Sequence, residues 1–161
     1  SINLRPFKGL KPEAFEADLQ INFLSLVKVI QSVLPNLLAS EQASIVVFSS
    51  VAATMGMPFH TSVAASKGAI EGFAKALAAE YAPKIRVNVI APSLTDTPLA
   101  DKFLNNETKQ EKSAERHPLK RFGKPEDSAQ MASFLLSDKS SWISGQIFHV
   151  DGGMSTLLVN G

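Results

Sequence analysis

Apolar residues recur every three or four positions between residues 13 and 40, as they do along one face of an amphipathic helix. This spacing predicts a helix over Glu13–Ser40, in one piece or two, with Pro12 in its first turn. Pro35 removes a backbone donor and is expected to kink the helix. The face expected to meet the core consists of Phe23, Val27, Ile30, Leu34 and Leu37.

The same pattern predicts two further helices and three strands. One helix, rich in alanine, covers Thr61–Ala82 and is ended by Pro83; the other covers Glu126–Ser137 and is opened by Pro125. Short runs of β-branched and apolar residues predict strands at 44–49, 85–91 and 146–150. Residues 94–122 are polar and irregular with some helical pattern, and they predict a flap or loop region.

Strands that alternate with helices in this way favour a parallel sheet joined by right-handed crossovers. The predicted fold class is therefore α/β, with one domain over residues 1–161. The strand at 44–49 is expected to lie at a sheet edge that lacks its neighbour. One face of the sheet is expected to lack part of its helical cover.

Composition narrows the function classes. The chain has 161 residues, 45% hydrophobic and 19% charged, with a net charge of +1 that favours no charged partner. It has no cysteine, which excludes disulfides and thiolate metal sites, and its histidines show no metal-ligand spacing. Lys28, Gln31 and Pro35 interrupt the apolar stretch 24–38, so no membrane span is predicted. Basic residues between 109 and 124 alternate with glutamates, which favours a solvated face over a nucleic-acid patch.

The residues that could take part in catalysis follow the first predicted strand. Ser50 comes at its end, and Lys67 follows seventeen residues later within Val63-Ala-Ala-Ser-Lys67. This arrangement resembles the short-chain dehydrogenase/reductase family, in which a serine after a strand acts with Tyr-x-x-x-Lys on a helix. The family serine precedes the tyrosine by thirteen residues, and here that position is Val63. The resemblance implies that Ser50 binds the substrate oxygen and that Lys67 holds the nicotinamide ribose, while valine supplies no proton.

The resemblance extends to other segments in the family's order. Asn22 matches the helix asparagine that supports the lysine through a water molecule, so the implied catalytic residues are Asn22, Ser50 and Lys67. Lys67, Pro92 and Thr97 are the implied cofactor-binding residues, with Pro92-Ser93 where the family usually has Pro-Gly. The segments His117–Asp127 and Ser144–Gly153 resemble the approach to the family's last long helix and its final strand and turn.

The family's glycine-rich phosphate turn is absent from this sequence, because none of its nine glycines forms Gly-x-Gly-x-x-Gly. The expected fold is therefore the C-terminal portion of a Rossmann-like doubly wound sheet, without the N-terminal βαβ part. The chain, which does not begin with Met, is expected to be a fragment or a processed product. NAD or NADP serves the full-length family, and no cofactor is expected to bind this chain alone.

Two functional interpretations remain open. One is an NAD(P)-dependent oxidoreductase acting on a carbonyl or alcohol, inactive or impaired in this chain; the other is a non-catalytic scaffold or oligomerisation subunit. His60 is a weak candidate for a substitute acid and is expected to be a helix-cap residue, while Tyr81 is too far along its helix. A dimer or tetramer through helices 13–40 and 61–82 is implied, formed by this chain with itself or with a separate chain that supplies the missing part. The expected location is the cytoplasm, and no nucleic acid, membrane or metal is expected as a partner.

Overall fold

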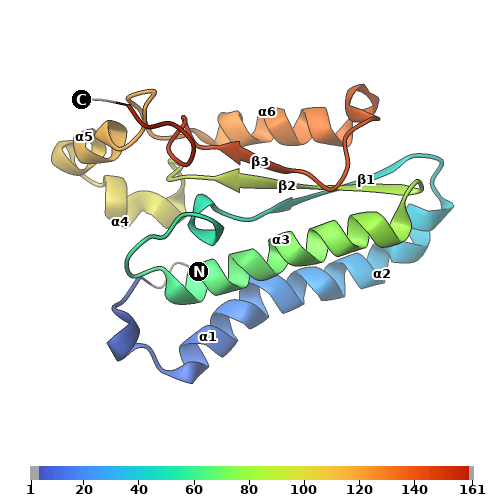
Figure 1. The fold of residues 1–161 in the computed structure, drawn as a ribbon, viewed down its shortest axis with the longest axis horizontal. Helices are drawn as coiled ribbons and strands as arrows, with labels where there is room; N and C mark the ends of the chain where they lie inside the picture. Colours follow the sequence, from blue (N-terminus) through green and yellow to red (C-terminus); the bar gives the residue numbers. More distant parts are fainter. Residues whose placement is uncertain (1–3, 160–161) are drawn as a thin grey trace.

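A three-stranded parallel sheet forms the centre of the fold (Figure 1). The computed structural model describes residues 4–159, so both ends of the expected domain 1–161 lie outside the described residues. The strands are β1 (Ala43–Phe48), β2 (Ile85–Pro92) and β3 (Ile147–Val150), in the order β1-β2-β3. Within the described part of the chain β1 pairs with β2 alone, which confirms that this strand lies at an edge.

The first helical run is continuous but irregular. It comprises α1 (Pro12–Leu19), a π-helical turn η2 (Gln20–Leu24) and α2 (Ser25–Ala39). The α-helix continues through Pro35, and the helix type changes at η2; the kink expected at Pro35 stays a prediction. Of the expected core face, Phe23, Ile30, Leu34 and Leu37 do pack in the core.

Helices cover both faces of the sheet. Helix α3 (Thr61–Tyr81) contacts β1 and β2 on the same side as α2, and α6 (Pro125–Leu136) contacts both strands from the other side (Figure 1). On this second face Phe48 of β1, which alternates with the core residue Val47, remains 44% exposed, so the helical cover is incomplete, as expected. Short 3-10 turns complete this part of the chain: η1 (Phe7–Gly9), η3 (Val51–Ala53) and η5 (Asp138–Ser140).

Residues 94–122 are more ordered than a loop. They contain the 3-10 turn η4 (Pro98–Ala100) and two helices, α4 (Asp101–Leu104) and α5 (Glu107–Glu115). The side chain of Asn106 accepts a hydrogen bond from the Lys109 amide at 2.9 Å and caps the start of α5. In Figure 1 both helices lie beyond the carboxyl end of β2, where they flank the functional region.

The core lies between the sheet and the helices α2 and α3. Its central side chains are Ile85, Val87 and Val89 of β2, each at most 1% exposed, which pack against Ile70 and Ala74 of α3. The side chains of the alternate residues of β2 point to the opposite face of the sheet, which α6 covers. There Arg86 donates hydrogen bonds to the carbonyls of Leu135, Ser137 and Ile143, and so binds the end of α6.

The outer face of residues 12–39 is apolar and exposed. Val29 is 59% exposed and Ile21 57%, although both side chains are large and hydrophobic. By length and composition the run Pro12–Ala39 is long and apolar enough to cross a membrane, and only 6% of its most apolar window is buried. Gly68 and Gly72 of α3 also face open space, with no atom of another element within 4 Å of a Cβ built at either position.

Candidate functional site

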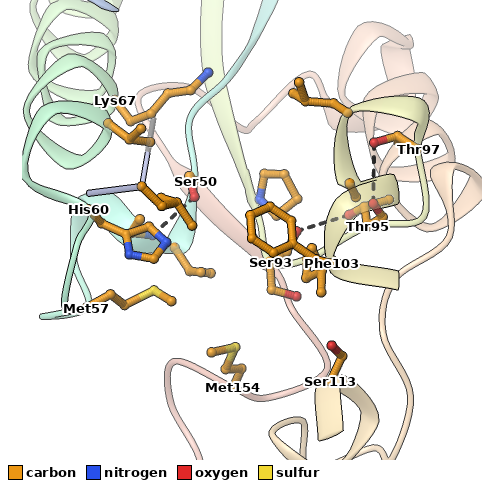
Figure 2. A pocket seen from close by; sticks show the side chains of 18 of the residues that line it. Ser50, Met57, His60, Lys67, Ser93, Thr95, Thr97, Phe103, Ser113 and Met154 are labelled. Atoms are coloured by element: carbon orange, nitrogen blue, oxygen red, sulfur yellow. Dashed lines mark hydrogen bonds between the residues drawn. The ribbon is translucent and has the colours of Figure 1, made fainter. Parts of the chain in front are cut away.

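A cavity of about 760 Å³ opens where β1 and β2 end. All five residues that the sequence singled out line it: Asn22, Ser50, Lys67, Pro92 and Thr97. Figure 2 shows Ser50, His60 and Lys67 along one side of this cavity and Ser93, Thr95 and Thr97 along the other. Ligands of open α/β sheets bind outside the carboxyl ends of the strands, so the location suits a binding site.

Ser50 presents a free hydroxyl proton to the cavity. It follows β1 directly and is the N-cap of η3, where its Oγ accepts a hydrogen bond from the Ala52 amide at 3.2 Å. Because that bond uses a lone pair, the O–H group is left to donate to a ligand. The neighbouring Ser49 is buried and donates to Glu71 Oε1 at 2.7 Å, so its hydroxyl is already used.

Lys67 and Asn22 bind main-chain carbonyls near the cavity. Lys67 Nζ donates to the carbonyl of Phe48 at 3.1 Å, and partial burial lowers the pKa of Lys67 because desolvation disfavours the ammonium. Asn22 lies in the π-helical turn η2 and donates through Nδ2 to the Asp18 carbonyl at 2.9 Å. Both residues reach the same cavity; the implied water between them stays a prediction.

Val63 occupies the position where the resemblance requires a proton donor. It lies on α3 one turn before Lys67 and is only 6% exposed. Its methyl groups neither donate nor accept a proton. Tyr81 ends the same helix eighteen residues later, about 27 Å along a helix with its ~1.5 Å rise per residue. Tyr81 packs against the core there, and it does not line the cavity.

His60 is the helix-cap residue that the sequence indicated, and it also lines the cavity. Its Nδ1 lies 2.7 Å from the carbonyl of Pro58. Since a carbonyl oxygen only accepts, this contact places a proton on Nδ1. Phe59 between them has a φ of 68°, in the left-handed region that a bulky side chain rarely adopts.

A hydrogen-bonded chain that sequence reasoning missed crosses the floor of the site. Ser93 Oγ lies 2.8 Å from Nε2 of His117, and His117 Nδ1 lies 2.7 Å from the carbonyl of Ser113. The His117 ring is buried, at 2% exposed, and each of its two nitrogens has a hydrogen-bond partner within the protein. The serine that replaces the family glycine thus ties the end of β2 to the segment after α5. The one sequence signal for this bond was the serine at position 93, where the family usually has glycine.

The residues that the resemblance places beside the nicotinamide lie at the end of β2 and just after it. Pro92 is its last residue, paired in register with Val150. Thr97 donates to the carbonyl of Thr95 in a long bond of 3.4 Å, and Thr95 in turn donates to the carbonyl of Ser93 at 3.1 Å (Figure 2). Within residues 4–159, no group of three or more histidine, aspartate or glutamate side chains is placed to hold a metal.

A family model described as Enoyl-(Acyl carrier protein) reductase matches residues 2–155. The chain belongs to the short-chain dehydrogenase/reductase family. Among members of this family, it is 40% identical over 146 residues to the 3-oxoacyl-[acyl-carrier-protein] reductase FabG of Thermotoga maritima. The match covers 90% of this chain and 58% of that reductase.

Two further proteins are similar to this chain. The inactive 2-(S)-hydroxypropyl-CoM dehydrogenase 2 of Xanthobacter autotrophicus is 38% identical over 79% of this chain and 57% of its own. The gluconate 5-dehydrogenase of Burkholderia cenocepacia, solved with NADP and tartrate, superposes with a TM-score of 0.89 at 26% identity. That superposition covers 96% of this chain and 61% of the dehydrogenase, so the chain spans about three fifths of its relatives.

Proposed function

We propose that this chain provides the substrate-side part of an NAD(P)-dependent oxidoreductase that acts on a carbonyl or alcohol, and that alone it is inactive or impaired. The observation that carries the proposal is the convergence of Asn22, Ser50, Lys67 and Thr97 on one cavity. The relatives support the reaction class, since they are reductases and dehydrogenases. The absence of an acid at Val63 supports the loss of activity.

The residues present fit only the nicotinamide half of the cofactor. Lys67 is half-buried beside the cavity, where its ammonium suits a ribose hydroxyl, and Thr97 lies across from it. When bound, the cofactor supplies or takes the hydride. The pyrophosphate half requires amide groups of a glycine-rich turn at a helix N-terminus, and this sequence holds no such turn. Weak or no binding of NAD and NADP by this chain follows.

Calorimetry tests this proposal directly. We expect the 161-residue chain to show no micromolar dissociation constant for NAD or NADP. We also expect that Val63→Tyr leaves the chain unable to reduce carbonyl compounds with NADPH, because the acid returns without the dinucleotide site. A micromolar dissociation constant for NAD or NADP, or measurable carbonyl reduction by the wild-type chain or by Val63→Tyr, would contradict the proposal. In a longer protein with the missing part, the same substitution should raise turnover about a hundredfold.

A non-catalytic scaffold or oligomerisation subunit is the second candidate. The exposed apolar face of α2, with Val29 59% and Val33 41% exposed, favours it, as does the open space at Gly68 and Gly72 of α3. Apolar surface of this kind is usual at interfaces between proteins. We propose that a second copy of the chain covers it, giving a homodimer or homotetramer.

Light scattering tests the assembly. We expect Val29→Glu to convert the oligomer into a monomer, because the substitution places a charge in the proposed interface. Leu158→Glu is the matched control, since Leu158 is 97% exposed near the other end of the chain. A wild-type chain that is monomeric at micromolar concentration would exclude this assembly.

A further inference from the structure

The wall of the cavity that faces Ser50 and His60 is basic. It is built from α4, α5 and the residue after α5, and Figure 2 shows Phe103 of α4 and Ser113 of α5 across the cavity from His60. The basic side chains that line the cavity from this wall are Lys102, Lys109, Lys112 and Arg116.

Helix α5 separates its charges between two faces. Lys109, Lys112 and Arg116 follow one another at helical spacing and line the cavity. Glu107, Glu111 and Glu115 recur every four residues and do not line it. The sequence alone suggested an evenly mixed, solvated surface. The helical period instead places the cations toward the cavity and the carboxylates away from it.

This separation is unfavourable for the helix itself. Lys112 and Arg116 are four residues apart, as are Glu111 and Glu115, and like charges at this spacing repel. The one ion pair recorded within residues 4–159 is Arg121–Asp127, so neither Lys112 nor Arg116 is neutralised by a described carboxylate. Lys109 differs, because its Nζ donates to the Lys102 carbonyl and to Asn105 Oδ1 at 2.8 Å.

The cavity itself offers no compensating negative charge. None of the described residues that line it is aspartate or glutamate, whereas Lys67 adds another ammonium on the opposite wall. A concave site with charges of one sign concentrates the field and attracts ions of the other sign. The volume of about 760 Å³ is ample for a small organic molecule.

We propose that this cavity binds a small organic anion, a carboxylate or phosphate ester that also carries a carbonyl or hydroxyl group. Arg116 and Lys112 hold the anionic group, since a guanidinium matches the two oxygens of a carboxylate or phosphate. Ser50 donates its free hydroxyl proton to the oxygen at the other end of the molecule. The proposal rests on the proposed function for the identity of that oxygen, but the binding step requires no turnover.

Nuclear magnetic resonance titration of the ¹⁵N-labelled 161-residue chain tests this binding. The probes are acetoacetate and dihydroxyacetone phosphate, each compared with a neutral partner, methyl acetoacetate and dihydroxyacetone. We expect saturable shifts of the Ser50 and Lys112 amides with the anions, and binding about tenfold weaker for the neutral partners. The stronger of the two anions identifies the preferred group as carboxylate or phosphate.

Substitutions on the two faces of α5 give a matched comparison. The double variant Lys112→Gln with Arg116→Gln should lose the preference for anions, while Glu111→Gln with Glu115→Gln should retain it. All four side chains are exposed, so both proteins should fold. Equal binding of charged and neutral probes, an unchanged preference in the basic-face variant, or no cavity shifts would overturn the proposal. Anion binding without turnover is the result that both proposals expect of this chain. Anion binding together with a micromolar dissociation constant for NADP would contradict the proposed function alone.

Discussion

The bond between Ser93 and His117 offers a direct test of how the site is held together. Ser93→Ala removes the hydroxyl that lies 2.8 Å from Nε2 of His117. The imidazole is 2% exposed, so this nitrogen would lose its partner in a place where solvent scarcely reaches. Leaving a buried polar group unsatisfied costs about 1–3 kcal/mol. We therefore expect Ser93→Ala to lower the free energy of unfolding by about 2 kcal/mol.

The loss of stability in Ser93→Ala should appear both in the melting temperature of the whole chain and in the proteolysis of one segment. For a chain of this length, a change of ~2 kcal/mol lowers the melting temperature by about 6 °C, which circular dichroism resolves. Because the bond ties the end of β2 to the segment after α5, proteolysis within residues 94–122 should also accelerate. Ser93→Thr keeps a hydroxyl and should restore most of the stability.

Thr97→Val is the matched control for this experiment. It removes a hydroxyl from the same wall of the cavity, but one whose recorded bond is 3.4 Å long and therefore weak. We expect a change of less than about 0.5 kcal/mol. If Ser93→Ala melts within one degree of the wild type, or no differently from Thr97→Val, the bond does not stabilise the fold and the reasoning is refuted.

Three further substitutions test other parts of the structure. Arg86→Met removes the donors that satisfy carbonyls at the end of α6, and should cost about 2–3 kcal/mol in urea unfolding. Burial lowers the pKa of Lys67 in the folded state, so the charged ammonium destabilises the fold at low pH. This destabilisation disappears as pH rises toward 10.5, the ordinary pKa of lysine. The free energy of unfolding of the wild type, relative to that of Lys67→Met, should therefore increase from pH 7 to pH 10. Hydrogen bonds from Arg121 and the Lys124 amide lower the pKa of Asp127 to about 2, so its stabilisation is present above 3.8 and lost as pH falls through about 2. Asp127→Asn should thus cost less than about 1 kcal/mol at pH 7, because the pair is largely solvated, and the cost should disappear below about pH 2.

The long elements of the fold were predictable because their signals are periodic. Strands β1 and β2 and helices α3 and α6 begin and end within one residue of the positions that the sequence indicated. Residues 94–122 were harder, since α4 and α5 are short and largely polar, and a side-chain cap at Asn106 replaces the apolar periodicity. At Pro35 the helix α2 continues, because its apolar face is fixed against the core and packing outweighs the local propensity.

The candidate site was predictable where residue spacing alone determines position. Ser50 at a strand end and Lys67 on the following helix meet because strand and helix geometry fix both. The Ser93–His117 bond joins residues 24 positions apart through irregular backbone, and no periodicity predicts such a contact. The basic wall is an intermediate case. The spacing of the charges on α5 was visible in the sequence, but which face meets the cavity is decided by the tertiary fold.

Val63 and Lys67 bear in different ways on the proposed scaffold, catalytic and binding roles. A subunit that served only as a scaffold would gain from Lys67 its hydrogen bond to the Phe48 carbonyl, while partial burial disfavours the ammonium. A catalyst would need a proton donor where Val63 presents only methyl groups to the cavity. A cationic cavity that holds an anion beside Ser50 has a use for Lys67 and none for an acid at position 63. The proposed binding of an anion therefore does not depend on an acid at position 63, and the titration of the α5 variants tests it separately from turnover.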